Sequence, residues 1–339
     1  MRLLRLGMDM QRREFITLLG GAAAAWPLTV RAQQPERMRR IGVLMQYTES
    51  DPEGQIRAKA LSQGLQKLGW KVGLNLRIDY RWAGGDHDRF RLHAADLVKL
   101  KDEVVVAVST PAVEALQRES MAVPVVFTQV SDPLGQGIVK SLAQPGGAVT
   151  GFSNYDQAIG GKWLELLKQV APTMTRAAVV FNPQTAPYSA LYMRSIEAAA
   201  PSIAVKVTTL QVHDSADIKT ALTDFAREPG GGLIMIPDAF TSAHREQIIE
   251  LAARFALPAM YPIRYYIADG GLISYGIDQV DQIRGAAIYV DRILKGERPG
   301  DLPVQAPTRF QLVVNLKTAK ALGLNISESF LLRADEVIE

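Results

Sequence analysis

Short apolar runs alternate with helical patterns along most of this chain. Residues 41–45 (IGVLM) and 104–108 (VVVAV) are continuously apolar, which is typical of strands buried on both faces of a parallel sheet. Between these runs, apolar residues recur at helical spacing, as in Leu61, Leu65 and Leu68. The alternation predicts an α/β fold with doubly wound, parallel sheets.

The alternation of strands and helices continues to the end of the chain, and the whole series begins a second time about halfway along it. We expect strands at residues 41–45, 76–82, 104–108, 123–127, 148–153, 177–181, 205–212, 233–236, 258–262, 272–275 and 310–316. A Pro-Gly-Gly turn at residues 145–147 precedes the strand after which the pattern begins again. Since the chain is longer than a typical single domain, the sequence predicts two similar lobes.

The first 32 residues have the features of an export signal and are set apart from the fold. Arg12 and Arg13 precede an apolar run of small residues, and Val30-x-Ala32 supplies a signal-peptidase site. The arginine pair fits an incomplete twin-arginine signal or an ordinary Sec signal. Because the apolar run is shorter than the ~20 residues of a spanning helix, we expect a periplasmic protein rather than a membrane-anchored one.

Charge and cysteine content narrow the possible functions. Residues 1–32 hold five arginines and two acidic residues, a net +3 that equals the charge of the whole chain. The remainder is therefore neutral, which argues against a nucleic-acid or membrane-binding surface. The chain has no cysteine, which excludes disulfides, thiol catalysis and a lipoprotein anchor.

No catalytic motif is present in the sequence. The chain lacks a GxSxG elbow, a GxxxxGK[ST] loop and an HExxH pair. Gly135-x-Gly137 lacks the third glycine of a dinucleotide fingerprint. None of the four histidines, His87, His93, His213 and His244, has a second His or Cys at metal-binding spacing. We therefore expect neither an enzyme nor a bound metal or cofactor.

Polar side chains gather just after the predicted strands, where parallel α/β sheets bind ligands. The candidates are Tyr47, Ser109, Thr110, Gln129, Ser131, Asp132, Asn182, Asp238 and Tyr261. Pro111 follows Ser109 and Thr110 as expected at a helix start, and such an N-terminus attracts a carboxylate. Helix capping alone also explains Ser109 and Thr110, a turn or cap explains Asp132 and Asp238, and packing explains Tyr261.

Residues 131–156, SDPLGQGIVKSLAQPGGAVTGFSNYD, resemble the signature of ABC-transporter substrate-binding proteins of the tryptophan/phenylalanine-binding-like group. Further similarity lies at residues 270–276 (GGLISYG), 293–296 (ILKG), 302–304 (LPV), 315–323 (NLKTAKALG) and 333–338 (RADEVI). Together these stretches cover nearly everything from residue 41 to the C-terminus, in the order of the family.

The resemblance implies a type I periplasmic-binding fold, with three crossings near residues 153, 275 and 308. One lobe would hold residues 38–152 and about 276–308, and the other 153–275 and about 309–335, after a signal at 1–32. The implied ligand is an amino acid or an aromatic relative. Its carboxylate would meet Ser109 and Thr110, and its ammonium would meet Asp132.

The function we predict is solute capture for an ABC permease in the inner membrane, by a monomer that binds no nucleic acid. The lobes would close on the ligand by hinge motion, and the closed form would dock on the permease. The alternative is a sensory protein that presents its ligand to a receptor or sensor kinase, and neighbouring genes would separate the two. An exported hydrolase would need a nucleophile elbow, which the sequence lacks.

We predict that the signal is cleaved after Ala32, so that the exported protein begins at Gln33. The small residues of Val30-x-Ala32 are the reason, because signal peptidase reads these two positions. N-terminal sequencing of periplasmic material checks this directly. A start well before Gln33, or retention in the membrane fraction, would contradict it.

Overall fold

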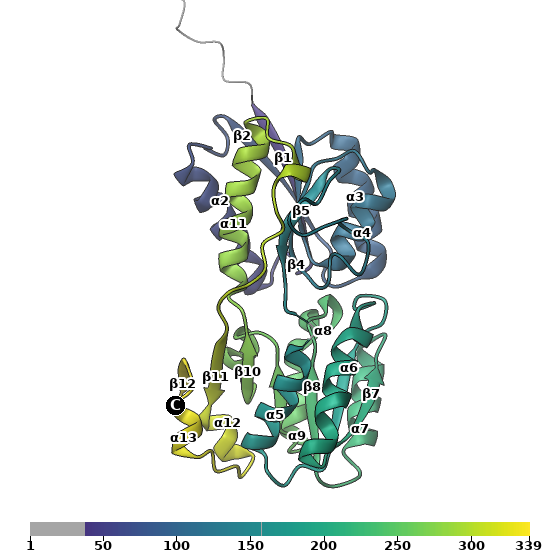
Figure 1. The fold of residues 1–339 in the computed structure, drawn as a ribbon, viewed down its shortest axis with the longest axis vertical. Coiled ribbons are helices and arrows are strands. Elements are labelled where there is room, and N and C mark those ends of the chain that lie inside the picture. Colours follow the sequence, from purple (N-terminus) through teal and green to yellow (C-terminus); the bar gives the residue numbers. More distant parts are fainter. Residues whose placement is uncertain (1–37, 157) are drawn as a thin grey trace, which may run out of the picture. The chain divides into compact units, whose positions relative to one another are not determined.

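The computed structural model describes residues 38–156 and 158–339, so the predicted export signal lies outside the described residues. From Arg39 onward the chain forms two α/β lobes, each built around one sheet (Figure 1). The strand order is β2-β1-β3-β4-β5 in lobe 1 and β12-β11-β10-β9-β8-β6-β7 in lobe 2. Each sheet is covered by helices on both faces, as the sequence predicts.

Lobe 1 contains most of the first half of the described chain and one later helix. Its elements are β1 (Arg39–Met45), α2 (Pro52–Lys67), β2 (Leu76–Trp82), α3 (His87–Leu100), β3 (Val104–Val108), α4 (Thr110–Glu119), β4 (Val125–Val130), β5 (Val149–Ser153), α11 (Gln279–Leu294) and η2 (Pro299–Asp301). All neighbouring strands of this sheet are parallel. Helices α2 and α11 pack together on one face, and α3 and α4 pack together on the other.

Lobe 2 contains the middle of the chain and its C-terminal segment. Its elements are α5 (Ile159–Val170), β6 (Arg176–Phe181), α6 (Ser189–Ala199), η1 (Ala200–Ile203), β7 (Lys206–Gln211), α7 (Ser215–Phe225), β8 (Gly231–Met235), α8 (Ala239–Ala243), α9 (Arg245–Arg254), β9 (Ala259–Tyr261), α10 (Tyr265–Ala268), β10 (Ile273–Gly276), β11 (Gln311–Asn315), α12 (Leu316–Ala321), α13 (Glu328–Leu331) and β12 (Glu336–Ile338). Strand β11 runs antiparallel to β10, whereas the other pairs are parallel.

The apolar sequence of β1 explains why both faces of its sheet are covered. Side chains alternate across a strand. Ile41 and Met45 therefore pack with α2 and α11, whereas Leu44 packs with α3 and α4. All three are fully buried. A polar residue in the middle of such a strand would be buried on either face, so polar groups are confined to the strand ends.

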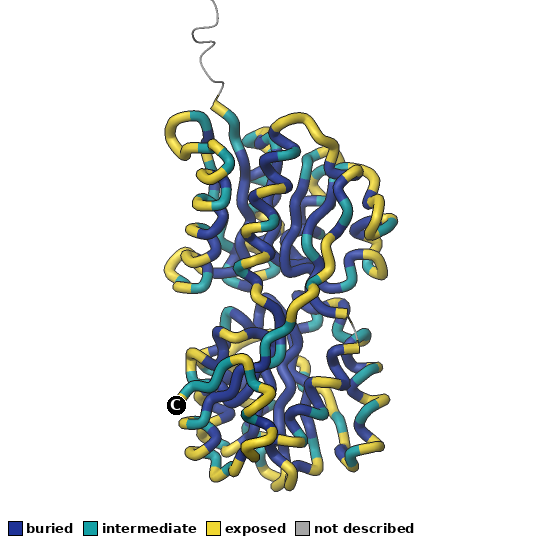
Figure 2. Tube along the Cα trace, turned by 60° about the vertical axis from the view of Figure 1, so that its left-hand side comes forward, coloured by how far each residue is buried: buried dark blue, intermediate teal, exposed yellow. Residues whose placement is uncertain are grey.

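Three segments connect the lobes, between β5 and α5, between β10 and α11, and between η2 and β11. The first and third lie side by side, because Gln305 N donates to the Gly151 carbonyl at 2.9 Å and Ser153 N donates to the Gln305 carbonyl at 2.9 Å. Buried residues fill both lobes, while the segment leading to β11 is largely exposed (Figure 2). A side chain at Gly151 would place Cβ 2.1 Å from the Phe127 carbonyl oxygen, so glycine is required there.

One strand end, one short helix and one short strand differ from the sequence prediction. Strand β4 was expected to end at residue 127, but it continues to Val130 through a break in register. The polar residues Thr128 and Gln129 are buried there because the strand end lies between the lobes. The short helix α8 (Ala239–Ala243), which meets α9 at His244, was not predicted. Strand β12 was not predicted, because three residues carry too little pattern.

A buried carboxylate lies in lobe 1, in the loop between α3 and β3. The Asp102 side chain is fully buried, and its nearest cation is Arg40, whose Nε lies 3.5 Å from Asp102 Oδ1. Arg40 and Arg77 pair more closely with Asp79, at 2.9 and 3.0 Å. Burial, with the charge of Asp79, raises the pKa of Asp102 to about 6, against the opposing effect of Arg40.

This pKa predicts a loss of stability with rising pH. The folded state favours protonated Asp102, so its stabilising effect is complete below the ordinary value of 3.8 and is lost as the pH rises through about 6. Asp102→Asn is neutral at every pH and should raise the free energy of unfolding at pH 7 by roughly 1–3 kcal/mol. Denaturant titrations from pH 4 to 7 measure this. The exposed Asp88→Asn is the control, and an unaltered pH profile in Asp102→Asn would contradict the prediction.

Candidate functional site: the cleft between the lobes

The loops that follow the parallel strands of the two lobes face each other. Tyr192 of α6 in lobe 2 donates from its hydroxyl to Ser131 Oγ of lobe 1, at 3.0 Å. Arg245 of α9 donates to Asp51, which begins α2, at 2.7 Å. The carboxyl ends of the strands therefore enclose a cleft between the lobes, which is where α/β proteins of this plan bind ligands.

The N-terminus of α4 lies on the lobe 1 side of the cleft. Ser109 is its N-cap residue, yet its side chain makes no capping hydrogen bond. Its backbone has φ of 111°, outside the region that a serine normally adopts. Thr110 is fully buried, and its Oγ1 accepts from Ser131 N at 3.4 Å. Ser109 is thus held in a strained conformation at a positive helix end.

The end of β4 forms a second group of polar residues. Gln129, with φ of 59°, accepts at Oε1 from Gln46 Nε2 at 2.8 Å and donates from its backbone N to Gln282 Oε1 at 3.0 Å. Asn154 of the first crossing donates to Ser131 Oγ at 3.4 Å. Side chains from β1, β4, α11 and the crossings are therefore joined in one network.

Several buried polar atoms around the cleft have no hydrogen-bond partner within the described part of the chain. They are Tyr47 OH, Ser109 Oγ, Gln129 Nε2, Asn154 Oδ1 and Tyr265 OH. Buried polar atoms in proteins are nearly always paired, because an unpaired one costs about 1–3 kcal/mol. Their position between the lobes makes this cleft the candidate binding site.

Aromatic and cationic side chains line one side of the site. The Arg57 guanidinium lies 4.8 Å from the centre of the Tyr47 ring and 5.5 Å from that of Tyr265. Burial raises the pKa of the Tyr47 hydroxyl, although the charge of Arg57 opposes the shift. Tyr47 is 1% exposed. Its hydroxyl is therefore neutral and able to donate a hydrogen bond.

Helix α6 supplies aromatic residues that the sequence did not identify as site residues. Tyr192 lies 5.4 Å from Trp163 and 6.1 Å from Tyr188, measured between ring centres. Tyr188 donates from its hydroxyl to the Pro237 carbonyl at 2.7 Å. Tyrosines on a predicted helix are more often packing residues, so only the contact of Tyr192 with Ser131 reveals its position.

The structure gives Asp238 and Asn182 mainly structural contacts. Asp238 caps α8, accepting from Phe240 N at 3.0 Å and Thr241 N at 3.3 Å. It also accepts from Asn182 N at 2.9 Å and from the Thr185 hydroxyl. Asn182 Oδ1 accepts from the backbone N of residue 184 at 2.8 Å. Capping of α8 accounts for two of the bonds of Asp238, and the other two tie it to the loop after β6.

Asp132 and Tyr261 also make local contacts. Asp132 Oδ1 accepts from Gly135 N at 3.0 Å, which closes a turn, and Asp132 has φ of 44°. Tyr261 stacks on Tyr266 at 4.9 Å within the hydrophobic core of lobe 2. A ligand contact of either residue remains a prediction.

Two cavities adjoin the cleft. One, of about 480 Å³, lies between residues 84–89 of lobe 1 and Asn182, His213 and His244 of lobe 2. The other, of about 330 Å³, is lined by Asp132, Asn154, Tyr155 and residues of the third crossing.

No group of three or more metal-ligating side chains occurs among residues 38–156 and 158–339. None of the helices in these ranges is long and apolar enough to cross a membrane.

A family model described as ABC transporter substrate binding protein matches residues 43–338. The chain belongs to this family. The family and fold predicted from residues 131–156 are therefore confirmed. Members of this family bind small solutes for a permease and are not enzymes, which agrees with the catalytic motifs being absent from the sequence.

Individual relatives agree with the family assignment. The tyrosine-binding protein of Clostridioides difficile (strain R20291) is 26% identical over 267 residues, 78% of this chain and 76% of the relative. The solved ABC domain from Streptococcus pneumonia in complex with L-Trp is 27% identical, with a TM-score of 0.81 over 88% of this chain and 99% of that one. A conserved domain protein from Vibrio cholerae is 30% identical, with a TM-score of 0.81 over 89% and 100%.

We predict that Asp238→Asn destabilises this substrate-binding protein, whereas Asp132→Asn does not. An amide at 238 replaces one acceptor oxygen with a donor that faces N–H or O–H groups, which should cost roughly 2–4 kcal/mol. An amide at 132 keeps an oxygen for Gly135 N. Thermal melting and denaturant titration of the two matched variants measure the difference. Equal stability of the two variants would show that the network around Asp238 contributes little.

Proposed function

We propose that this substrate-binding protein carries an amino acid with an aromatic side chain to its ABC permease. The family assignment gives the general role, which is capture of a small solute and its delivery to the permease. The finer proposal names the solute, and it includes export to the periplasm and action as a monomer. It is supported by the chemistry of the cleft and by two relatives whose names state what they bind.

The observation that carries the proposal is the unpaired Ser109 hydroxyl at the N-terminus of α4. A helix N-terminus supplies backbone N–H groups and a positive dipole end, which favour an anion. Ser109 is only 4% exposed, so its Oγ has little access to water. A ligand carboxylate at this position would satisfy the hydroxyl and the helix end together.

The remaining contacts fit the other parts of an amino acid. Rings of Tyr47, Tyr265 and Tyr192 surround the cleft, and such rings pack well against an aromatic side chain. The unpaired Tyr47 and Tyr265 hydroxyls can bond a polar group on that side chain. Asp132, at the mouth of one cavity, is our candidate for the ligand ammonium. One relative is named a tyrosine-binding protein and one structure holds L-Trp, which supports the same class.

The test is calorimetric titration of the purified protein with L-tryptophan, L-tyrosine and L-phenylalanine. We expect at least one to bind with a Kd in the micromolar range or below. Tryptamine, which lacks the carboxylate, should then bind at least about thirtyfold more weakly than tryptophan, because about 2 kcal/mol corresponds to that ratio. No binding of any aromatic amino acid, together with another solute found by native mass spectrometry, would overturn the proposal.

Ser109→Ala separates the carboxylate contact from folding. Ser109 Oγ has no partner within the described chain, so its removal should leave the melting temperature unchanged. A hydrogen bond to a charged group is worth about 1.5–3 kcal/mol, so affinity should fall roughly ten- to hundredfold. Ser202→Ala, which changes an exposed hydroxyl of η1, is the matched control. Unchanged affinity in Ser109→Ala would exclude Ser109 from the site.

A further inference from the structure

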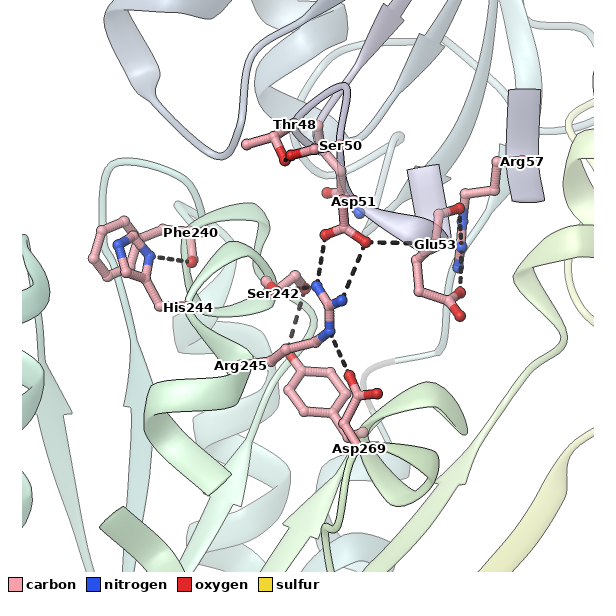
Figure 3. Close-up of polar contacts among 12 residues, drawn as sticks. Thr48, Ser50, Asp51, Glu53, Arg57, Phe240, Ser242, His244, Arg245 and Asp269 are labelled. Atoms are coloured by element: carbon pink, nitrogen blue, oxygen red, sulfur yellow. Dashed lines mark hydrogen bonds and ion pairs between the residues drawn. The ribbon is translucent and has the colours of Figure 1, made fainter. Parts of the chain in front are cut away.

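We propose that Asp51, Arg245 and Tyr265, with Arg57, form a clasp that holds the lobes closed and sets how long the ligand stays bound. The proposal rests on the proposed function only for its ligand measurement, since closure of the lobes can be followed without ligand. Figure 3 shows the central contacts, with Asp51 reaching Arg245 from above and Asp269 reaching it from below.

The first half of the clasp is an ion pair across the cleft. Arg245 Nη1 lies 2.7 Å from Asp51 Oδ2, and Nη2 lies 3.1 Å from Oδ1, so the pair is bidentate. The Arg245 side chain is 6% exposed and that of Asp51 10%. Other ion pairs between described residues join groups of the same lobe. Asp51–Arg245 is therefore the charged contact that closure makes and opening breaks.

The second half places an aromatic ring between two guanidinium groups. Tyr265 of lobe 2 lies 5.5 Å from Arg57 of lobe 1 and 5.3 Å from Arg245 of its own lobe. Arg57 also donates to Gln279 Oε1, at the start of α11, at 2.8 Å. Residue 279 directly follows the second crossing. The clasp therefore joins both lobes and a hinge segment through one buried group of side chains.

Each charged member keeps a partner in its own lobe, which makes the clasp reversible. Arg245 Nε donates to Asp269 Oδ2 at 2.7 Å, within lobe 2. Asp51 caps α2 by accepting from Glu53 N at 2.9 Å, within lobe 1. Arg57 pairs with Glu53 at 2.6 Å. Opening the lobes removes one contact from each group without leaving a charge buried and unpaired, so the open state remains accessible.

Such a contact acts mainly on ligand release. A buried, bidentate ion pair must break before the lobes separate, whereas the ligand enters while the lobes are open. We therefore expect its loss to raise the dissociation rate constant more than it alters the association rate constant. Asp51 and Arg245 would then be positioning residues that act through closure, without a role in ligand recognition.

The main test is Asp51→Asn. Asparagine is as good an N-cap residue as aspartate, so α2 should remain intact while the charge of the clasp is lost. Asp214→Asn is the matched control, because Asp214 caps α7 in the same way and is exposed, and its side chain accepts from Asp217 N. Melting temperatures of the two variants should agree closely with that of the native protein.

Closure is measured first without ligand. The chain has no cysteine, so Met121→Cys in lobe 1 and Leu332→Cys in lobe 2, both highly exposed, can carry a pair of fluorophores. Single-molecule energy transfer should show a smaller closed population in Asp51→Asn than in the native sequence or in Asp214→Asn. Equal closed populations in all three proteins would overturn the clasp. This result does not depend on which ligand the protein carries.

Ligand release is measured second, by stopped-flow fluorescence with L-tryptophan or L-tyrosine. Asp51→Asn should raise the dissociation rate constant at least about tenfold. A double-mutant cycle with Arg245→Lys tests the pairing, because two residues in contact give effects that do not add. Additive effects, or an equal increase in Asp214→Asn, would overturn the clasp. Failure of every aromatic amino acid to bind would overturn the proposed function, and the ligand-free measurement would still decide the clasp.

Discussion

The fold depends on burying both faces of a parallel sheet. In β1 and β3 every central side chain is apolar because helices cover both faces. Polar groups can then occur only where a strand ends. Since all strands of lobe 1 are parallel, their carboxyl ends lie at one edge, and the candidate site residues Tyr47, Ser109 and Gln129 gather there. Packing of the core thus determines where the ligand can bind.

This constraint explains why much of the fold was predictable from the sequence. The runs at residues 76–82 and 104–108 match β2 and β3 residue for residue. Helix α11 follows β10 of lobe 2 in the sequence but packs in lobe 1. No local sequence pattern predicts this, and only the family resemblance implied it. The end of β4 was misjudged because Thr128 and Gln129 are polar, yet both are buried, and Gln129 contacts Gln46 and Gln282, which are far away in the sequence. The hydropathy of neighbouring residues does not predict that a segment is buried by a distant part of the chain.

The site was predictable in part for the same reason. Position after a strand predicted that Ser109, Gln129 and Ser131 lie in the cleft, and the structure places them there, because strand order fixes where such residues lie. It could not distinguish a free polar group from one that is already paired, as with Asp238, whose oxygens accept from four neighbours. It also could not find Arg57, a helical residue that only the packed structure brings between two tyrosine rings.

Backbone strain and unpaired polar atoms occur together in this cleft. Of the six described non-glycine residues with positive φ, three lie here: Ser109 follows β3, Gln129 lies at the end of β4, and Asp132 follows it. Ser109 and Gln129 also carry unpaired side-chain atoms. Each feature costs stability, so their persistence requires a well-packed sheet beneath them. Under the proposed function, a bound ligand pairs these atoms and recovers part of that free energy. Under the proposed clasp, lobe contacts that favour the closed, ligand-bound form also increase the affinity for the ligand.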